Sequence, residues 1–564
     1  MKRLPHLLIL VLFSLPAGES HAQQSAALPT SAVQHRQQIA QFAEWPADVP
    51  VKCGFPLITR MLEQRASLSP PAASALQHVM TRPGTQTSKM SGGFRVHYDT
   101  TGTHAAALLD ASYNRIPNSA HAYADSVLAT IQRVVAVEID SLGYLLPPPD
   151  GDAGGGPEYD IYVQELGNYY GETAWDSLNP VTRTGSTYMT IDNDFAKFVK
   201  PPSNQGMPAL RVTLAHEFHH AIQVGRYGWW QGDDYFYEIT STWMEDVVFT
   251  EVNDYYNYVS LSWPYSHFRF PDKEFVSGAD LVMYSRGIWG QYVAKKFSAA
   301  TMRRAWENIP AVRPDAAMDQ ALRERSSSLA VAFSEWAVWN YFTNSRSDSV
   351  LYYPEGANFP RIRAEVIDFF PPDRTLTGTL PPLATRYHQV NTNTDTLMII
   401  VSNTNAIAAE SGNASVPYSV SVSNQQIDDS YLPAGAGLYA KLTVADPVHW
   451  TMWFVVGKNV NQGSQLPEGT PFPNPFVSDG KREVFIPLSS AAQVKCTLAI
   501  YNASMDLVYS RDVMSEARPI LGRQAVSWNG LTTAGALAAT GVYVYVLRLA
   551  DDRLLTGKIA LVKQ

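Results

Sequence analysis

The sequence predicts a multidomain protein in which an α+β domain is followed by two all-β sandwich modules. Its 564 residues exceed the usual length of one domain. Residues 91–370 mix helical and strand-like hydrophobic periodicity. From residue 371 onward, β-branched and aromatic runs alternate with turn residues, a pattern typical of strands alone.

Composition excludes several classes of protein. Hydrophobic residues make up 45% and aromatic residues 11% of the chain, which excludes wholesale disorder. The net charge is −9 and no dense Lys/Arg block is present, so nucleic acid is not an expected partner. The two cysteines, Cys53 and Cys496, are too few for a disulfide-rich scaffold or a cysteine-type zinc finger.

The N-terminus has the three parts of a signal peptide. Lys2 and Arg3 precede the apolar run Leu7–Leu15, and Ser20-His21-Ala22 is a small-x-small cleavage site. We therefore expect residues 1–22 to be removed and the protein to be secreted or held at the cell surface. No later segment has the ~20 apolar residues of a membrane span. Residues 23–90, rich in Gln, Ala, Ser and Pro, are expected to form a pro-region or leader with one helix at 33–42.

The α+β domain is expected over residues 91–370. Its expected strands are 94–98, 159–163 and 186–191, and its expected helices are 122–142, 208–224, 235–250, 285–296 and 328–342.

Two β-modules follow. The first, 371–458, has expected strands at 396–401, 418–422, 438–444 and 450–456. A Gly/Pro/Asn/Gln-rich linker over 459–471 separates it from a module at 472–564, with expected strands at 483–486, 496–501, 524–528 and 542–549. This strand spacing suits a small Ig-like sandwich.

The chemically informative segment is His216-Glu217-Phe218-His219-His220. It contains His-Glu-x-x-His, in which residues i and i+4 lie on one helix face, so His216 and His220 can bind one metal ion. Glu217 is placed to act as general base on a metal-bound water. Leu210–Ala215 and Ala221–Gln223 favour a half-buried helix around the motif, and His219 lies off the ligand face.

A catalytic zinc ion needs a third protein ligand and an open position. Glu238, which follows His220 by 18 residues, is the expected ligand. Glu245 shares its helix face at i+7, and Glu245 or Asp246 is expected to orient an imidazole. The alternative is that Glu238 lies at the rim and Glu245 binds the metal.

HEFHH, followed at this distance by E-x-x-x-T-W-M-E-D, resembles the gluzincin class of metallopeptidases. Over residues 94–345 the chain is similar to secreted bacterial zinc metallopeptidases related to the immune inhibitor A type. The resemblance implies a zincin-like domain, with His216, His220 and Glu238 as zinc ligands and Glu217 as catalytic base. Thermolysin-like relatives carry an Asp four residues after the ligand Glu; here Thr242 takes that position, which leaves the His-orienting group open.

Peptide hydrolysis also needs a group that stabilises the oxyanion. Gluzincins use a Tyr or His from a downstream segment, and Tyr284 and His267 are the candidates here. For Tyr284, simple core packing is the alternative. The strand at 186–191 is expected to be the edge strand that pairs with an extended substrate.

Two further sites are less specific. Asp150 and Asp152, beside Gly154-Gly155-Gly156, have the hard oxygen ligands of a calcium site, but an EF-hand's acidic twelfth position is missing, so a polar loop is the alternative.

Lys52-Cys53-Gly54-Phe55-Pro56 resembles the cysteine-switch peptide of matrix metalloproteases, in which a pro-region thiolate caps the zinc. Lys52 and Leu57 depart from its usual Arg and Asp. A spectator Cys53, or a Cys53–Cys496 disulfide, is the alternative.

The last module resembles the Ig-like domain of flagellar hook-capping proteins and the C-terminal sorting domains of type IX secretion cargo. The resemblance rests on Asn474-Pro475-Phe476, Trp528-Asn529-Gly530 and Gly541–Tyr545. It implies secretion machinery as a partner.

Together these patterns predict a secreted, zinc-dependent endopeptidase made as a zymogen, which acts on protein or peptide substrates. An extracellular binding or adhesion protein with an inactive protease fold, and a zinc hydrolase of non-peptide bonds, are the alternatives.

Overall fold

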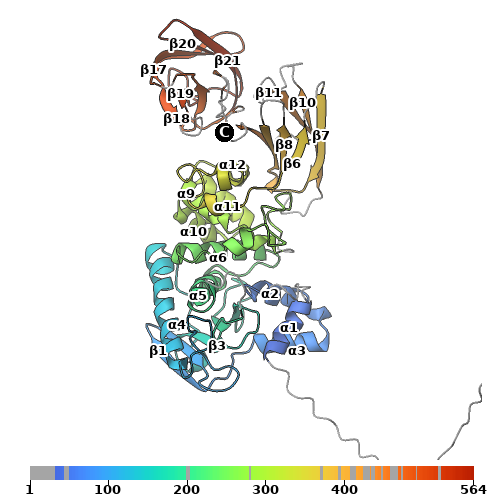
Figure 1. The fold of residues 1–564 in the computed structure, drawn as a ribbon, viewed down its shortest axis with the longest axis vertical. Helices are drawn as coiled ribbons and strands as arrows, with labels where there is room; N and C mark the ends of the chain where they lie inside the picture. The colour runs from blue at the N-terminus through green and yellow to red at the C-terminus, as the bar shows by residue number, and fades with distance from the viewer. Residues whose placement is uncertain are drawn as a thin grey trace, which may run out of the picture.

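The structure is a computed structural model (Figure 1). It describes residues 32–42, 50–197, 204–277 and 281–368. It also describes the β-rich remainder up to residue 563, outside the gaps at 369–372, 392–395, 407–414, 424–431, 434–438, 446–448, 458–467, 470, 472–473, 475, 491 and 519–522. The expected signal peptide and most of the expected linker lie outside the described residues. No helix in the described part of the chain has the length and apolar character needed to span a bilayer.

A five-stranded mixed sheet forms the base of the N-terminal α/β region. Its strand order is β1-β2-β3-β5-β4, with β2, β3 and β5 parallel to one another and β1 and β4 antiparallel to their neighbours. The strands are β1 (Thr87–Ser91), β2 (Phe94–Tyr98), β3 (Tyr159–Gln164), β4 (Gly171–Trp175) and β5 (Thr187–Asp192).

The expected edge strand is wrong. β5, expected at 186–191, pairs with β3 on one side and β4 on the other. β4 is therefore the edge strand beside the site. It was missed because Gly171–Trp175 lacks a β-branched run and is too short for a periodicity argument.

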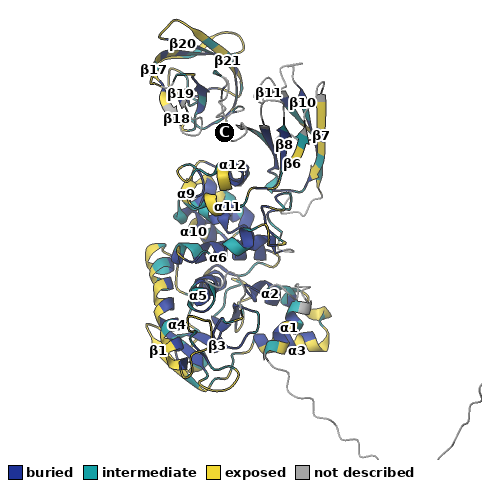
Figure 2. Cartoon of the chain, viewed as in Figure 1, coloured by how far each residue is buried: buried dark blue, intermediate teal, exposed yellow. Residues whose placement is uncertain are grey.

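Two helices pack on the sheet, and the second carries the motif. α4 (Ala120–Val135) extends into a π-helical turn at Ala136–Ser141, and α5 (Met207–Ile222) packs against β4 and β5. Residues 212–222 of α5 are all buried, as expected of a helix inside a domain. α6 (Asp234–Val248) packs directly on α5, and both helices are dark in the burial view (Figure 2).

The remaining helices form a second layer that extends from α6. They are α7 (Tyr256–Val259), α8 (Val282–Ser285), α9 (Ile288–Lys296), α10 (Ala299–Asn308), α11 (Pro314–Arg323) and α12 (Leu329–Tyr341). The helix expected at 285–296 is divided between α8 and α9 around Arg286 and Gly287. α10 and α11 were not expected from the sequence.

The expected leader contains three helices where one was predicted: α1 (Ala32–Phe42), α2 (Phe55–Glu63) and α3 (Pro70–Val79). α1 packs on α3, and α2 packs on β4 and α6 (Figure 1). The expected boundary at residue 90 falls inside β1, which pairs with β2 as part of the main sheet. The separate helical part of the leader therefore ends before Thr87.

Two pairs of β-sheets complete the chain. In the first pair, β11-β12-β10-β7 and β13-β9-β8-β6 share one apolar core that includes Val420 and Val401. The strands are β6 (Glu365–Asp368), β7 (Asp373–Leu380), β8 (Ala384–Asn391), β9 (Thr396–Asn403), β10 (Val416–Ser423), β11 (Leu432–Pro433), β12 (Tyr439–Val444) and β13 (Trp450–Gly457).

The second pair, β14-β21-β20-β16-β17 and β15-β19-β18, shares a core around Trp528 and Cys496. The strands are β14 (Phe476–Ser478), β15 (Val484–Pro487), β16 (Lys495–Tyr501), β17 (Leu507–Met514), β18 (Glu516–Arg518), β19 (Arg523–Trp528), β20 (Gly541–Leu549) and β21 (Leu554–Lys563). Cys496 and Cys53 are both free thiols in separate cores, so they form no disulfide.

Candidate metal centre

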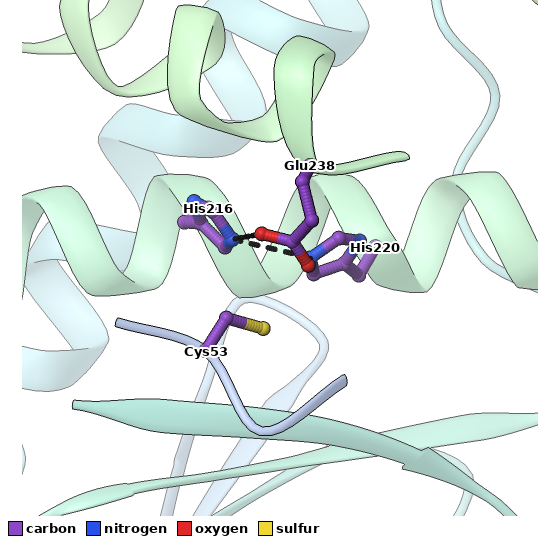
Figure 3. A group of neighbouring side chains, drawn as sticks. All are labelled: Cys53, His216, His220 and Glu238. Atoms are coloured by element: carbon purple, nitrogen blue, oxygen red, sulfur yellow. Dashed lines mark hydrogen bonds and ion pairs between the residues drawn. The ribbon is translucent and has the colours of Figure 1, made fainter. Parts of the chain in front are cut away.

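α5 and α6 bring two imidazoles and a carboxylate to one point in the interior. His216 Nε2 and His220 Nε2 are 3.1 Å apart. Glu238 of α6 places Oε2 3.2 Å from His216 Nε2 and Oε1 3.1 Å from His220 Nε2 (Figure 3). Ligand atoms about 2.1 Å from a tetrahedral zinc ion lie about 3.4 Å from one another. The three spacings therefore fit one small cation.

Electrostatics at this point also favour a cation. Burial alone would lower the pKa of His216, but Glu238 and Glu245 raise it to about 10. Burial alone would raise the pKa of Glu238, but His220 and His216 lower it to about 2. Both Glu238 oxygens face an imidazole Nε2. A buried carboxylate is stable only with such a partner, and a metal ion between these atoms would serve the same purpose.

Cys53 completes the group from the opposite side. One ligand atom from each of Cys53, His216, His220 and Glu238 lies within 4.8 Å of the other three, and all four residues are buried. Figure 3 shows the thiol of Cys53 beside α5, on a segment between that helix and the sheet. Burial, Glu217 and Glu238 raise the pKa of this thiol. A metal ion would reverse that shift, because a coordinating thiol loses its proton. The donor set therefore fits a buried metal ion with four protein ligands.

Each imidazole is oriented by a second group. Glu245 Oε1 is 2.7 Å from His216 Nδ1, and Gln223 Oε1 is 2.7 Å from His220 Nδ1. Glu245 thus contacts the far nitrogen of His216, whereas Glu238 faces the shared point. This placement favours Glu238 over Glu245 as the ligand.

Asp246 and Thr242, also named from the sequence, do not orient a ligand. Asp246 accepts a hydrogen bond from Gln291 Nε2 at 2.9 Å, and Thr242 packs its methyl group close to Gly287. Glu245, one turn beyond Thr242, takes the orienting position because it lies on the α5-facing side of α6.

Glu217 lies beside the group and is held by the edge strand. The hydroxyl of Thr173 on β4 donates to Glu217 Oε2 at 2.7 Å. Burial raises the pKa of Glu217, an effect opposed by His216 and His220. His219 points away from the ligands, with Nδ1 2.8 Å from Glu138 Oε2. His216, Glu217 and His220 therefore point toward the metal group, whereas His219 packs on the side of α5 that faces Glu138.

The two candidate oxyanion donors lie in different places. Tyr284 is buried on α8, with its ring 5.5 Å from that of Tyr258. Burial, then Glu238 and Cys53, raise its pKa. His267 is not in the metal-binding group formed by the described residues. Its ring stacks on Trp336 of α12 at 4.6 Å, and Nε2 contacts the Asn340 amide at 3.2 Å. His267 is a core residue of the helical layer.

Residues 51–55 of the leader, here the 51–55 segment, lie against the first residue of β4 and the residues that precede it. Val51 N donates to Asn168 O at 2.9 Å, Tyr170 N donates to Val51 O at 3.0 Å, and Gly54 N donates to Gly171 O at 2.9 Å. Gly54 is required by this approach, because a Cβ there would lie 2.7 Å from Glu172 Cβ. The segment therefore bonds to the sheet edge at two points, through an isolated parallel bridge at Val51 and through Gly54, which is the N-cap of α2.

Side chains also anchor the leader. Lys52 Nζ is 3.0 Å from Glu245 Oε2 and 2.7 Å from Asp254 Oδ2. Phe55 stacks on the ring of His220, with centroids 4.4 Å apart. Arg36 of α1 forms a buried ion pair with Glu172 on β4. These contacts cover the metal group from the leader side.

An arginine from outside the loop already pairs with one of the two expected calcium ligands. Arg82 forms ion pairs with Asp150, Asp160 and Asp176, and Asp152 is exposed. A guanidinium thus neutralises the carboxylate of Asp150, which corrects the calcium expectation.

Several contacts at this site had no signal in the sequence analysis. Thr173 was missed together with its strand. Gln223 could have been found, since i+3 from His220 is a helical neighbour. Lys52 was noted only as a departure from the cysteine-switch pattern, because its partners Glu245 and Asp254 lie about 200 residues away along the chain.

Comparisons with known proteins add a distant structural likeness. No family model matches the chain, and no curated protein matches it. Two solved structures from Porphyromonas gingivalis are similar to part of it. The dimeric latent PorU is 13% identical, with a TM-score of 0.15, over 30% of this chain and 18% of that chain. PorZ, described as an essential bacterial surface component of the type-IX secretion system, is 15% identical, with a TM-score of 0.14, over 30% of this chain and 29% of that chain. This chain spans less than a third of either protein, and the likeness identifies no function for it.

Proposed function

We propose that the protein is a secreted zinc-dependent endopeptidase made in a latent form, with the leader covering its active site. The observation that carries the proposal is the buried convergence of His216, His220 and Glu238, with Glu217 on the same helix. Three protein ligands from one His-Glu-x-x-His helix and its neighbour match what a catalytic zinc site requires once its fourth position is free.

The chain's own residues have distinct tasks in this proposal. Zinc bound by His216, His220 and Glu238 would supply Lewis-acid polarisation of the scissile carbonyl. Glu217 takes a proton from the attacking water and returns it to the leaving amine, held in place by the hydroxyl of Thr173. Tyr284 is the proposed hydrogen-bond donor to the developing oxyanion.

The edge strand favours a polypeptide substrate over a non-peptide one. The leader backbone already pairs with this edge next to the metal group, at Val51 with Tyr170 and at Gly54 with Gly171, before it turns into α2 at Phe55. A substrate strand would use the same backbone groups after the leader has been removed, as in other β-strand additions. A binding or adhesion protein would have no need for the Glu217–Thr173 pair at this point.

The test combines metal content with activity. The full chain is purified and its zinc measured, and the leader is then removed by limited proteolysis before casein and peptide hydrolysis are assayed. We expect about one zinc per chain in the wild type and in Glu217→Ala, loss of zinc in His220→Ala, and loss of hydrolysis in both variants.

The matched control is His121→Ala, because His121 is an exposed histidine on α4 whose Nδ1 contacts Tyr98 Oη at 2.6 Å. It should leave zinc and hydrolysis unchanged. A wild-type protein without zinc, or a processed Glu217→Ala variant as active as the wild type, would sink the proposal.

Export is part of the same proposal. Residues 1–22 would direct it, and the module at 472–564 would contact secretion or surface-attachment machinery. N-terminal sequencing of the exported protein should give Gln23 as its first residue or a later one. Deletion of 472–564 should change where the protein accumulates, and an unchanged distribution would remove the sorting role.

A further inference from the structure

The side chain of Lys52 fills a closed pocket beside the metal group. The lysine is 1% exposed, and its Nζ lies 3.0 Å from Glu245 Oε2 and 2.7 Å from Asp254 Oδ2. Nζ also lies 4.6 Å from the ring centroid of Tyr170 and 5.9 Å from that of Tyr258. Two carboxylates and two aromatic faces around one ammonium are a complete set of partners for a lysine side chain.

The body of the protein builds this pocket, and the leader only occupies it. Asp254 Oδ1 accepts hydrogen bonds from the side-chain amides of Asn204, at 3.1 Å, and Asn257, at 3.2 Å. Glu245 is held through its contact with His216 Nδ1. These residues all follow the leader in sequence, so the pocket walls remain when the leader is removed.

The pocket also has a defined place relative to the reacting centre. Lys52 immediately precedes Cys53, whose Sγ belongs to the metal group. The backbone on either side of these two residues pairs with Tyr170 and Gly171 at the sheet edge. A polypeptide bound along the same edge would therefore place a side chain in this pocket from a residue next to the metal-facing position.

Removal of the leader takes away the ammonium that pairs with Glu245 and Asp254. With Lys52 in place, Asp254 is fully buried and Glu245 is 1% exposed, so the walls fit closely around a lysine side chain. A charge held in such a site is favourable only with a partner of opposite sign. A substrate ammonium would restore the same ion pairs, whereas an apolar or acidic side chain would not.

We propose that this pocket selects a lysine side chain next to the scissile bond, so that the substrates are polypeptides cleaved beside lysine. The inference rests on the proposed peptidase function and names its substrate class. Lys52 is the occupant already present in the pocket, and it shows the length and charge that the pocket accepts.

The test uses the processed protein and three matched peptides that differ at one position beside the cleaved bond. That position holds lysine, acetyl-lysine or norleucine, so the two controls remove the charge without any change to the protein. We expect kcat/KM for the lysine peptide to exceed the other two by about tenfold or more, from the lost charged hydrogen bonds. Mass spectrometry of the products shows on which side of the bond the lysine lies.

A substitution in the pocket wall tests whether the preference for lysine comes from this pocket. In Asp254→Asn, the ratio of kcat/KM for lysine over norleucine should fall several-fold, with the norleucine peptide as internal reference. The matched control is Glu251→Gln, because Glu251 is exposed and pairs with Arg211 on the surface; its ratio should equal that of the wild type.

The outcomes separate the two proposals. Hydrolysis of none of the peptides, nor of casein, contradicts the peptidase function itself. Hydrolysis with equal rates for lysine, acetyl-lysine and norleucine overturns the lysine pocket and leaves the peptidase standing. Should Asp254→Asn fail to fold, the three peptides on the wild-type protein still decide the question.

Discussion

Replacement of Lys52 by methionine should release the 51–55 segment from the sheet edge. The substitution keeps most of the side-chain stem and removes the ammonium that pairs with Glu245 and Asp254. All three side chains are no more than 1% exposed, so water screens these pairs little. We therefore expect a large effect from a single charge.

The magnitude follows from the cost of breaking a buried ion pair. Removing one partner and leaving the other charge buried costs about 3–5 kcal/mol. Since each 1.4 kcal/mol is tenfold in an equilibrium constant, docking of the segment should weaken by about two to four orders of magnitude. Phe55 on His220 and Cys53 at the metal group remain, so the leader should still dock in part.

Hydrogen exchange of the amides of Val51 and Gly54 measures this directly, because both donate to the β4 side in the docked state. Their protection should fall sharply in Lys52→Met, and the unprocessed variant should gain peptide hydrolysis. Lys89→Met is the matched control, since Lys89 pairs with Asp125 at the surface, where both side chains are about half exposed. Wild-type protection of these amides in Lys52→Met would refute the reasoning.

Two further variants test the metal group. Cys53→Ser should raise peptide hydrolysis by the unprocessed chain, because a serine hydroxyl is a poorer zinc ligand than a thiolate; the gain should stay below that of the processed protein while the Lys52 pairs remain, and unchanged latency contradicts a capping role. Glu245→Gln should lower zinc affinity by about 10–100-fold, measured by competition with a chelator, because Glu245 orients His216; an unchanged affinity would mean that Gln holds the imidazole equally well.

The spacing of hydrophobic residues along the sequence predicted much of the architecture. The helices around His216 and Glu238 were expected at 208–224 and 235–250, and they lie at Met207–Ile222 and Asp234–Val248. Both were recognisable because each is a run of mostly buried residues about four turns long, bounded by residues that end a helix. The short strand β4 and helices α2 and α3 were missed, because five to ten residues carry too little periodicity to be separated from a loop.

Roles that depend on distant partners were harder to predict. His267 was a candidate because it is an imidazole in an aromatic loop, but its ring is used to pack against Trp336. Asp150 was a candidate calcium ligand, but its carboxylate pairs with the guanidinium of Arg82. In both positions the residue type was compatible with chemistry, and the neighbour that decided its use came from another element.

By itself, the sequence determined that His216 and His220 lie on one face of a helix with Glu217 beside them, because helical geometry places residues i and i+4 together wherever the helix forms. It also provided Glu238 on the next helix and a cysteine upstream. Only the tertiary structure decided that these groups converge, that β4 is the sheet edge, and that Lys52 enters a pocket of Glu245 and Asp254. Such contacts join residues far apart along the chain, and they form only when burial of the surrounding core brings those elements together.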